Sequence, residues 1–268
     1  MTPIKLAIAG AAGRMGRQLI SAANAAGHTV AGGTEHAASE HLGSDLGTLA
    51  GLPALGRTLV ADTAAAAQDA TIWIDFTRPD ITLEALSRLA DTPVKSVIIG
   101  TTGFTDRQTE AIKAYSDRFT IVQAGNFSLG IALMTRLTEL AAKHLGEDWD
   151  IEILETHHRH KLDAPSGTAL MLGDAAATGR DAKLDTLRQA PYDGPDAQRE
   201  RGKIGFSVRR SGGVIGEHDV SLSSETERIS ISHSALDRRV FADGAVKAAE
   251  WASSQSPGLY TIHEVLGL

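Results

Sequence analysis

A glycine-rich turn near the amino terminus constrains the fold more than any other feature of the sequence. Residues Gly10–Gly16 carry glycine at the first, fourth and seventh positions, directly after the apolar run Ile4–Gly10 and at the start of a segment of helical composition, Arg14–Ala26. The apolar run predicts a buried strand. Glycines at a strand-to-helix turn let a pyrophosphate approach the backbone N–H groups of a helix N-terminus. Such turns also serve packing alone, and the spacing is G-x-x-G-x-x-G rather than G-x-G-x-x-G, but the context favours nucleotide binding.

Strands and helices continue to alternate as far as Asn126. The pattern predicts further strands at His28–Gly33, Thr71–Phe76, Val94–Ile99 and Thr120–Ala124, with helices at Ala61–Asp69, Ile81–Leu89 and Asp106–Tyr115. This order is typical of an α/β fold with a parallel sheet that is covered by helices on both faces.

The pattern changes after Asn126. It predicts helices at Leu129–His144, Gly167–Ala176 and Ala242–Trp251 and strands at Trp149–Thr156, Ile204–Arg210, His218–Ser223 and Glu227–Ser232. Late strands with few helices between them favour an antiparallel or mixed sheet in a second domain. The polar segment Pro191–Glu200 is expected to be an exposed loop.

The charge of the chain restricts its partners. The sequence holds 26 Lys and Arg against 33 Asp and Glu, a net charge of −7, and no basic face is evident, so we expect no nucleic-acid partner. It contains no cysteine, which excludes disulfides, thiolate metal sites and thiolate nucleophiles.

The first residues lack the pattern of a signal peptide and no apolar run approaches a membrane span of about 20 residues, so we expect a cytoplasmic protein. An acidic protein that binds an anionic substrate must concentrate positive charge locally.

Polar and aromatic residues gather at the predicted carboxyl ends of the strands, where ligands bind in parallel sheets. Glu35 ends the second strand, a position from which an acidic residue bonds the adenosine ribose hydroxyls; an ordinary solvated carboxylate is the alternative. Further strand ends carry Asp75–Pro79, Gly100–Phe104 and Asn126-Phe127, and together they predict a rim around a nicotinamide, although any one alone would be a turn. The predicted cofactor-binding residues are Gly10, Gly13, Arg14, Met15, Gly16, Glu35, Phe76, Arg78, Gly100, Thr102, Gly103, Asn126 and Phe127.

The segment Glu155–Thr168 supplies the local positive charge. Five consecutive basic or titratable side chains, His157–Lys161, lead into Ser166-Gly167-Thr168, which opens a predicted helix whose N–H groups would bind a carboxylate. The three histidines could instead bind zinc, although no carboxylate partner motif accompanies them, and a purely structural cluster is a further alternative. We expect an anion site and no metal.

His157–Lys161 followed by Asp163–Ala169 closely resembles the signature of the 4-hydroxy-tetrahydrodipicolinate reductase family, the dihydrodipicolinate reductases of the diaminopimelate and lysine pathway. The E-x-H-H-R-x-K-x-D-x-P-S-G-T string is too long for a chance match. The resemblance covers nearly the whole chain, because these segments fall in family order: Gly10–Gly16, Asp75–Pro79, Gly100–Phe104, Asn126–Ser128, Arg209–His218 and Ser232-His233.

The resemblance implies NAD(P)H-dependent reduction of a six-membered cyclic imine dicarboxylate, or of its hydroxylated precursor, which loses water. Hydride would be delivered to ring C4 and the nitrogen system protonated. Lys161 matches the general acid, and His157 matches a histidine that assists substrate polarisation. His158, Lys161, Gly167 and Thr168 match carboxylate-binding positions.

The resemblance also implies the domain organisation and the assembly. A Rossmann-type dinucleotide-binding domain with a parallel sheet would comprise residues 1–126 plus 236–268. An α+β domain with a mixed sheet, residues 127–235, would bind the substrate and form a homotetramer.

Three positions depart from the family pattern: His36 stands where arginine is frequent, Gly125 where alanine is common and Ala132 where asparagine is frequent. The first bears on the cofactor. Glu35 would repel the 2′-phosphate of NADPH and His36 would not offset it, so we expect NADH to serve at least as well as NADPH. Another Rossmann-type reductase of a small dicarboxylate and a non-catalytic NAD(H)-sensing protein are the alternative functions.

Overall fold

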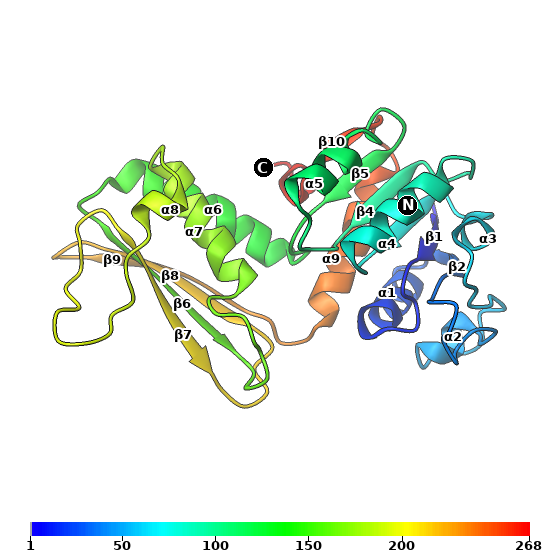
Figure 1. Cartoon of the computed structure of the whole chain (residues 1–268), viewed down its shortest axis with the longest axis horizontal. Helices are drawn as coiled ribbons and strands as arrows, with labels where there is room; N and C mark the ends of the chain where they lie inside the picture. The colour runs from blue at the N-terminus through cyan, green and yellow to red at the C-terminus, as the bar shows by residue number, and fades with distance from the viewer. Residues whose placement is uncertain (1) are drawn as a thin grey trace. The chain divides into compact units, whose positions relative to one another are not determined.

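Six short strands form a fully parallel sheet in the first of two compact units (Figure 1). The computed structural model describes residues 2–268. The first unit extends to Ser128 and resumes over Arg239–Gly267, and the second comprises Leu129–Arg238. The strands of the first unit are β1 (Lys5–Ile8), β2 (Thr29–Gly33), β3 (Ile72–Asp75), β4 (Ser96–Ile99), β5 (Thr120–Gln123) and β10 (Gly258–Tyr260), in the order β10-β5-β4-β3-β1-β2.

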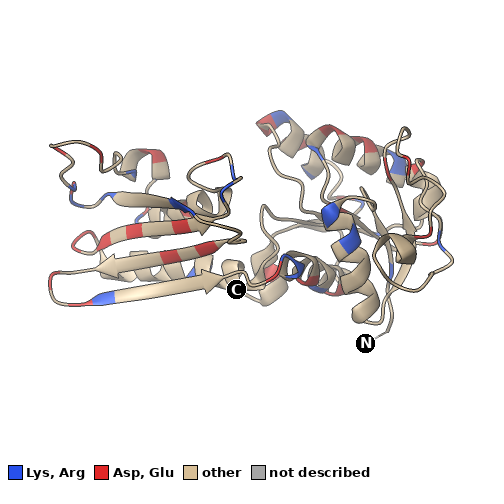
Figure 2. Ribbon diagram, turned by 90° about the horizontal axis from the view of Figure 1, so that it is seen from below, with Lys and Arg blue, Asp and Glu red and all other residues tan. Residues whose placement is uncertain are grey.

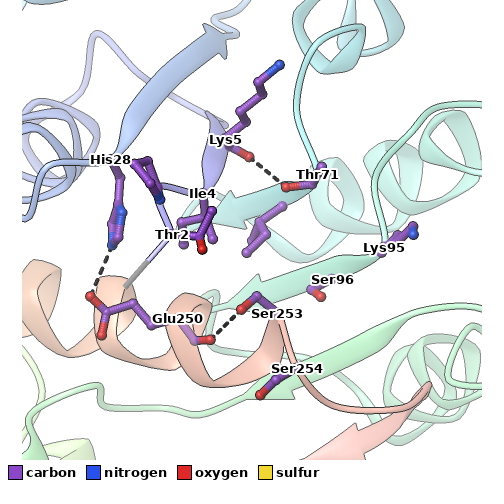
Figure 3. A pocket seen from close by; sticks show the side chains of 12 residues that line it. Thr2, Ile4, Lys5, His28, Thr71, Lys95, Ser96, Glu250, Ser253 and Ser254 are labelled. Atoms are coloured by element: carbon purple, nitrogen blue, oxygen red, sulfur yellow. Dashed lines mark hydrogen bonds and ion pairs between the residues drawn. The ribbon is translucent and has the colours of Figure 1, made fainter.

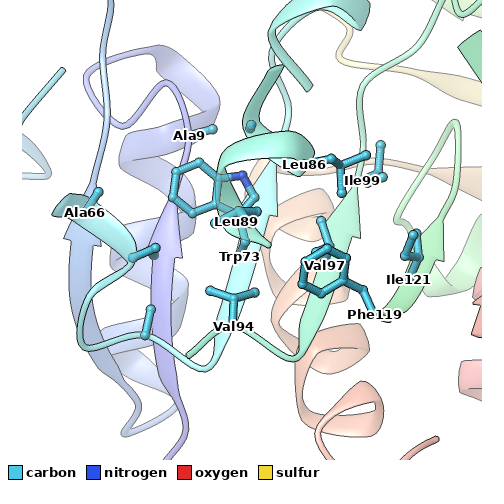
Figure 4. Close-up of a cluster of buried hydrophobic side chains, with 14 of the residues drawn as sticks. Ala9, Ala66, Trp73, Leu86, Leu89, Val94, Val97, Ile99, Phe119 and Ile121 are labelled. Atoms are coloured by element: carbon cyan, nitrogen blue, oxygen red, sulfur yellow. The ribbon is translucent and has the colours of Figure 1, made fainter. Parts of the chain in front are cut away.

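Helices cover both faces of this sheet because its strands are apolar on both sides. Side chains alternate between the faces, and on one face Trp73 and Val97 pack with Leu86, Leu89 and Phe119 in a single buried cluster (Figure 4). Helices α3, α4 and α5 contribute to that cluster, and α9 contacts β3, β4 and β5 and packs against α1. The helices are α1 (Arg14–Ala25), α2 (Leu46–Leu49), α3 (Thr63–Ala67), α4 (Pro79–Leu89), α5 (Asp106–Lys113), α9 (Arg239–Ala252) and α10 (Ile262–Leu266).

The order of the strands places a topological switch point at β1. The chain passes from β1 to β2 on one side and then returns to β3 on the other side of β1. In such sheets ligands bind at the carboxyl ends of the strands beside the switch point. The glycine-rich turn Gly10–Gly16 follows β1 at that position.

The second unit is built on a mixed sheet of four strands in the order β7-β6-β8-β9. The central strand β6 (Asp150–His157) pairs parallel with β7 (Ile204–Arg210) and antiparallel with β8 (Glu217–Ser223), which pairs antiparallel with β9 (Arg228–Ser234). Acidic residues mark the two central strands and basic residues the two edge strands (Figure 2).

One face of this sheet is covered by helices (Figure 1). The helices of the unit are α6 (Leu129–Leu145), α7 (Gly167–Gly179) and α8 (Leu184–Leu187). Ile151, Ile153 and Val220 of the sheet pack in one core with Met134 of α6 and Leu172 of α7. Removing one such buried side chain by substitution to alanine typically costs about 2–5 kcal/mol of stability, so this core fixes the position of the ends of β6 and α7.

The α/β class with a parallel sheet and a second, mixed sheet is confirmed. We predicted domain boundaries at Asn126 and Ala235, and the compact units change over after Ser128 and after Arg238. The expected helix over Ala61–Asp69 was too long, since only Thr63–Ala67 is helical, and four short elements were not predicted: α2, α8, β10 and α10. Among residues 2–268, no helix combines the length and the apolar composition that crossing a bilayer requires.

Candidate active site

The glycine-rich turn brings backbone N–H groups to the carboxyl end of β1. Gly10 has a φ of +61°, in the left-handed region that favours glycine. A Cβ at Gly16 would stand 2.2 Å from the carbonyl oxygen of Gly10, so only glycine lets α1 begin this close to the turn. Gly13 is the N-cap of α1 and has no side chain to cap it, which leaves the first turn of the helix open to an anion.

Glu35 lies beside that turn. Its Oε2 accepts a hydrogen bond from the Ala12 N–H at 3.3 Å, and its Oε1 accepts one from the His36 N–H at 3.1 Å. His36 is exposed, and its Nδ1 accepts a hydrogen bond from the Ala38 N–H at 3.2 Å. The structure thus places a carboxylate and an imidazole next to the glycine-rich turn.

The residues that follow β3, β4 and β5 lie close together and include two aromatic rings. The rings of Phe76 and Phe127 lie 5.3 Å apart, and a Cβ at Gly100 would stand 2.1 Å from the Phe76 ring. Asn126 Oδ1 accepts a hydrogen bond from the Ser128 N–H at 2.8 Å, which holds the chain after β5. The structure thus brings together residues that the sequence placed at three separate strand ends, and the remaining predicted rim residues, Arg78, Thr102 and Gly103, are exposed.

Asp75, the last residue of β3, holds the loops after β3 and β4 together by hydrogen bonds. It is fully buried, and its Oδ1 accepts hydrogen bonds from the Thr77 N–H at 3.0 Å, the Thr77 hydroxyl at 2.6 Å and the Thr101 hydroxyl at 3.2 Å. Its Oδ2 is buried without a hydrogen-bond partner among residues 2–268. Burial raises the pKa of Asp75, and the hydrogen bonds from Thr77 and Thr101 oppose that shift.

In the second unit, Glu155 occupies the centre of a buried hydrogen-bond network. Its Oε2 accepts from His157 Nδ1 at 2.6 Å, both oxygens accept from Arg210 at 2.8 and 3.0 Å, and Oε1 accepts from the Ser166 N–H at 3.0 Å. The carboxylate is fully buried. Burial by itself would raise the pKa of Glu155, but the hydrogen bonds from Arg210 and His157 outweigh it and hold that pKa below its usual range.

The network continues to the helix α7. Ser166 is the N-cap of α7, and its hydroxyl oxygen accepts from the Ala169 N–H at 3.1 Å and lies 3.1 Å from His218 Nε2. Burial lowers the pKa of His218 to about 4, so this ring is neutral at pH 7. A Cβ added at Gly167 would meet no atom within 4 Å, so the first residue of α7 has open space beside it.

The predicted cationic loop connects β6 to α7. The Lys161 N–H donates to the His158 carbonyl at 3.1 Å, and Lys161 Nζ donates to Asp163 Oδ1 at 2.8 Å. Arg210 Nη2 donates to the Asp163 carbonyl at 2.7 Å and so anchors the loop to β7. Burial and the charge of Arg238 lower the pKa of His158, which makes it an uncharged hydrogen-bonding group at pH 7.

A cavity of the first unit lies at the opposite edge of its sheet. It measures about 650 Å³ and is lined by residues at the amino ends of the strands, such as Lys5, Thr71 and Ser96 (Figure 3). Ligands of parallel sheets bind at the carboxyl ends, so we do not assign the cofactor to this cavity. Among residues 2–268, no three or more histidine and acidic side chains are grouped so that they could hold a metal ion.

Sequence reasoning missed the residues that organise the second site. The motif assigns no role to the side chains of Glu155 and Ser166, although Ser166 begins the predicted helix, and the segment Arg209–His218 predicts no site role for Arg210 or His218. The register places them together, since His157 pairs with Arg210 across β6 and β7, and Glu155 pairs with His218 across β6 and β8. Glu155 and His157 continue the alternate positions of Ile151 and Ile153, which face the apolar core, and titratable residues at such positions were the available signal.

Comparisons with known proteins agree along the whole chain. Family models described as the N-terminus and the C-terminus of dihydrodipicolinate reductase match residues 4–127 and 130–266. The chain is 48% identical over 267 residues to the 4-hydroxy-tetrahydrodipicolinate reductase of Parvibaculum lavamentivorans, covering 99% of this chain and 98% of that protein. It is 46% identical over 269 residues to the enzyme of that name from Bradyrhizobium diazoefficiens, covering 100% and 99%. The solved dipicolinate-bound dihydrodipicolinate reductase from Paenisporosarcina sp. TG-14 has the same fold, with a TM-score of 0.76 at 24% identity over 97% of this chain and 98% of that one.

Proposed function

The chain belongs to the dihydrodipicolinate reductase family. From that premise we propose which of its residues bind the substrate, transfer a proton and bind the cofactor in the reduction of 4-hydroxy-tetrahydrodipicolinate to tetrahydrodipicolinate. The enzyme is an NAD(P)H-dependent oxidoreductase of the diaminopimelate route to lysine. One observation carries the assignment of the substrate site. The cationic loop His157–Lys161 and the open amino end of α7 are joined by the hydrogen bonds of one buried carboxylate, Glu155.

We assign substrate binding to that loop and helix end. The substrate carries two carboxylates, and Lys161 together with the backbone of Gly167 and Thr168 would bind one of them. His158, neutral at pH 7, would contribute a hydrogen bond without a charge. A chain with a net charge of −7 needs such a local cationic surface to retain a dianion.

We assign proton transfer to Lys161 and polarisation of the substrate to His157. Lys161 Nζ is held by Asp163 in the structure, and an anionic substrate would compete with that carboxylate for the ammonium group. His157 turns its Nδ1 to Glu155, so its Nε2 is the nitrogen that would face the substrate. A positioned acid typically contributes 10²–10⁴-fold to a rate.

The turn of the first unit fits a dinucleotide. The uncapped start of α1 would bind the pyrophosphate, Glu35 the ribose hydroxyls, and the loops with Phe76, Gly100 and Phe127 would surround the nicotinamide. The reduced nicotinamide, when bound, supplies the hydride. We propose that NADH serves at least as well as NADPH, because the carboxylate of Glu35 lies beside the turn and the next residue is a histidine rather than an arginine.

We also propose that the enzyme is a homotetramer assembled through the second unit. Its edge strands carry the exposed apolar residues Val208 of β7 and Ile229 of β9, and an open sheet edge of this kind normally needs a partner. Light scattering at micromolar concentration is expected to give four times the mass of one chain. A monomer would contradict this proposal.

A coupled assay tests the function directly. Purified protein is mixed with NADH and freshly generated 4-hydroxy-tetrahydrodipicolinate, and the fall in NADH absorbance is recorded. Pyridine-2,6-dicarboxylate, a planar ring with two carboxylates, is expected to compete with the substrate, and less strongly in Lys161→Ala. An NAD(H)-binding protein without turnover would leave the absorbance unchanged, and a reductase of another dicarboxylate would act on its own substrate but not on this one.

A further inference from the structure

Glu155 is in contact with three different parts of the second unit. Its four hydrogen bonds reach His157 on its own strand β6, Arg210 on β7 and the backbone of Ser166 at the start of α7. Arg210 in turn bonds the Asp163 carbonyl of the cationic loop. One buried carboxylate therefore ties the proposed polarising histidine to the helix end and to the loop that would bind the substrate.

Arg210 keeps that carboxylate charged. A bidentate guanidinium–carboxylate pair, here 2.8 and 3.0 Å, is among the strongest charge-assisted contacts in proteins. An isolated carboxylate in a fully buried position would instead become neutral. Although it is fully buried, Glu155 thus remains able to accept a hydrogen bond from an N–H of the His157 ring.

We propose that Glu155 is a positioning residue for the reduction, which holds the His157 ring with its proton on Nδ1 and presents Nε2 to the substrate. The inference rests on the proposed function, since it concerns the histidine assigned there. A carboxylate can only accept, so the 2.6 Å contact requires the proton to lie on Nδ1.

The surroundings of the ring support this orientation. A Cβ added at Gly216 would stand 3.1 Å from His157 Nε2, so glycine at that position leaves this nitrogen uncovered by a side chain. The edge of the ring packs against His218 at 5.2 Å between centroids. His218 is uncharged at pH 7 because burial lowers its pKa, and it therefore does not repel a proton on the neighbouring ring.

The first experiment determines the tautomer of His157 and does not depend on catalytic activity. Nitrogen-15 spectra of the histidine-labelled whole protein, assigned with His157→Gln, are expected to show His157 protonated at Nδ1. In Glu155→Gln the side-chain amide can donate to Nδ1, so the population with the proton on Nε2 is expected to increase. A neutral wild-type ring protonated only at Nε2 would overturn the proposal, even if the enzyme reduces its substrate as proposed.

The second experiment separates positioning from folding. Glu155→Gln is expected to lower kcat on the order of 10-fold to 100-fold, since misplacing a reacting group by about 1 Å can cost 100-fold, while the KM for NADH stays the same. Glu217→Gln, an exposed glutamate on the neighbouring strand β8, is the matched control and should retain wild-type kcat. A Glu155→Gln enzyme that folds and keeps both wild-type kcat and the wild-type tautomer would refute the role.

Discussion

Asp75 in the first unit and Glu155 in the second are both fully buried carboxyl groups, yet their surroundings move their pKa values in opposite directions. Asp75 receives only uncharged donors, from Thr77 and Thr101, and burial prevails. Glu155 receives the guanidinium of Arg210, which outweighs burial. The difference shows that the partner, rather than the degree of burial, determines whether a buried acid keeps its charge.

The same contrast separates the two candidate sites. The site of the first unit is made of backbone N–H groups, glycines and aromatic rings, and its buried acid joins the loops that carry them. The site of the second unit is made of charged and titratable side chains around Glu155. We infer that the first unit contributes mainly binding and orientation, whereas the second unit supplies the groups that transfer protons and polarise the substrate.

Lys161→Ala is the strongest test of this division. We expect kcat to fall by roughly 10²–10⁴-fold, the usual loss when a general acid is removed, while the Kd for NADH measured by fluorescence titration remains that of the wild type. Lys183→Ala, an exposed lysine elsewhere in the second unit, is the control and should leave both quantities unchanged. Turnover at the wild-type rate in Lys161→Ala would show that Lys161 is not the general acid.

Gly16→Ala should produce the opposite pattern. The new Cβ would stand 2.2 Å from the Gly10 carbonyl oxygen, so the backbone of the turn must move away from the position that fits a pyrophosphate. We expect the Kd for NADH to rise by about 10-fold to 100-fold, since overpacking of this kind costs about 1–3 kcal/mol.

Gly213→Ala is the matched control for that glycine, because a Cβ there meets no atom within 4 Å. Isothermal titration of both variants with NADH gives the two Kd values. If Gly16→Ala binds NADH as tightly as the wild type, the turn serves only to pack α1 against β1.

The difference between the sites also explains how far the sequence could predict them. The glycine-rich turn is a local pattern, with strand, turn and helix adjacent in the chain, so its place at the switch point followed from the alternation of elements. Glu155 and Arg210 are 55 positions apart, and only the register of β6 against β7 makes them neighbours. Composition and spacing contain no information about that register.

Short elements were missed for a related reason. β10 has three residues, Gly258–Tyr260, and no apolar run marks it, yet it completes the sheet by pairing with β5. Its existence depends on α9 returning the chain to the edge of β5, which is a tertiary effect. The helices α2 and α8 have only four residues each, too few for the period of a helix to be recognised.

Stability as a function of pH tests the two buried acids directly. The folded state favours the neutral form of Asp75, so ionisation in the unfolded chain, beginning near the ordinary value of 3.8, lowers the stability of the fold as pH rises. Glu155 has the opposite sign, because its lowered pKa stabilises the fold above the ordinary value of 4.5 and that contribution is lost as pH falls. We therefore expect Asp75→Asn to gain stability relative to the wild type from pH 4 to pH 7, and Glu155→Gln to lose it.

Thermal unfolding of both variants at these two pH values measures the effect. Differences in Tm of a few degrees are expected, since 1 kcal/mol corresponds to about 2–4 °C in a chain of this size. The same sign of change in both variants would show that burial alone governs the two acids, against the comparison drawn above.

The smallest expected effect concerns a single exposed side chain of the first unit, His36. If that site binds through backbone groups, then the choice between NADH and NADPH depends on the few side chains near the ribose, and Glu35 disfavours a 2′-phosphate. His36→Arg adds a permanent positive charge beside Glu35, so we expect the KM for NADPH to fall by up to about tenfold, which corresponds to ~1.4 kcal/mol, with kcat and the KM for NADH nearly unchanged. Steady-state kinetics with both cofactors decide this, and His36→Gln, which adds no charge, is the control. A wild-type enzyme that already prefers NADPH tenfold or more in kcat/KM would show that another cation, such as Arg14 of the turn, determines cofactor choice.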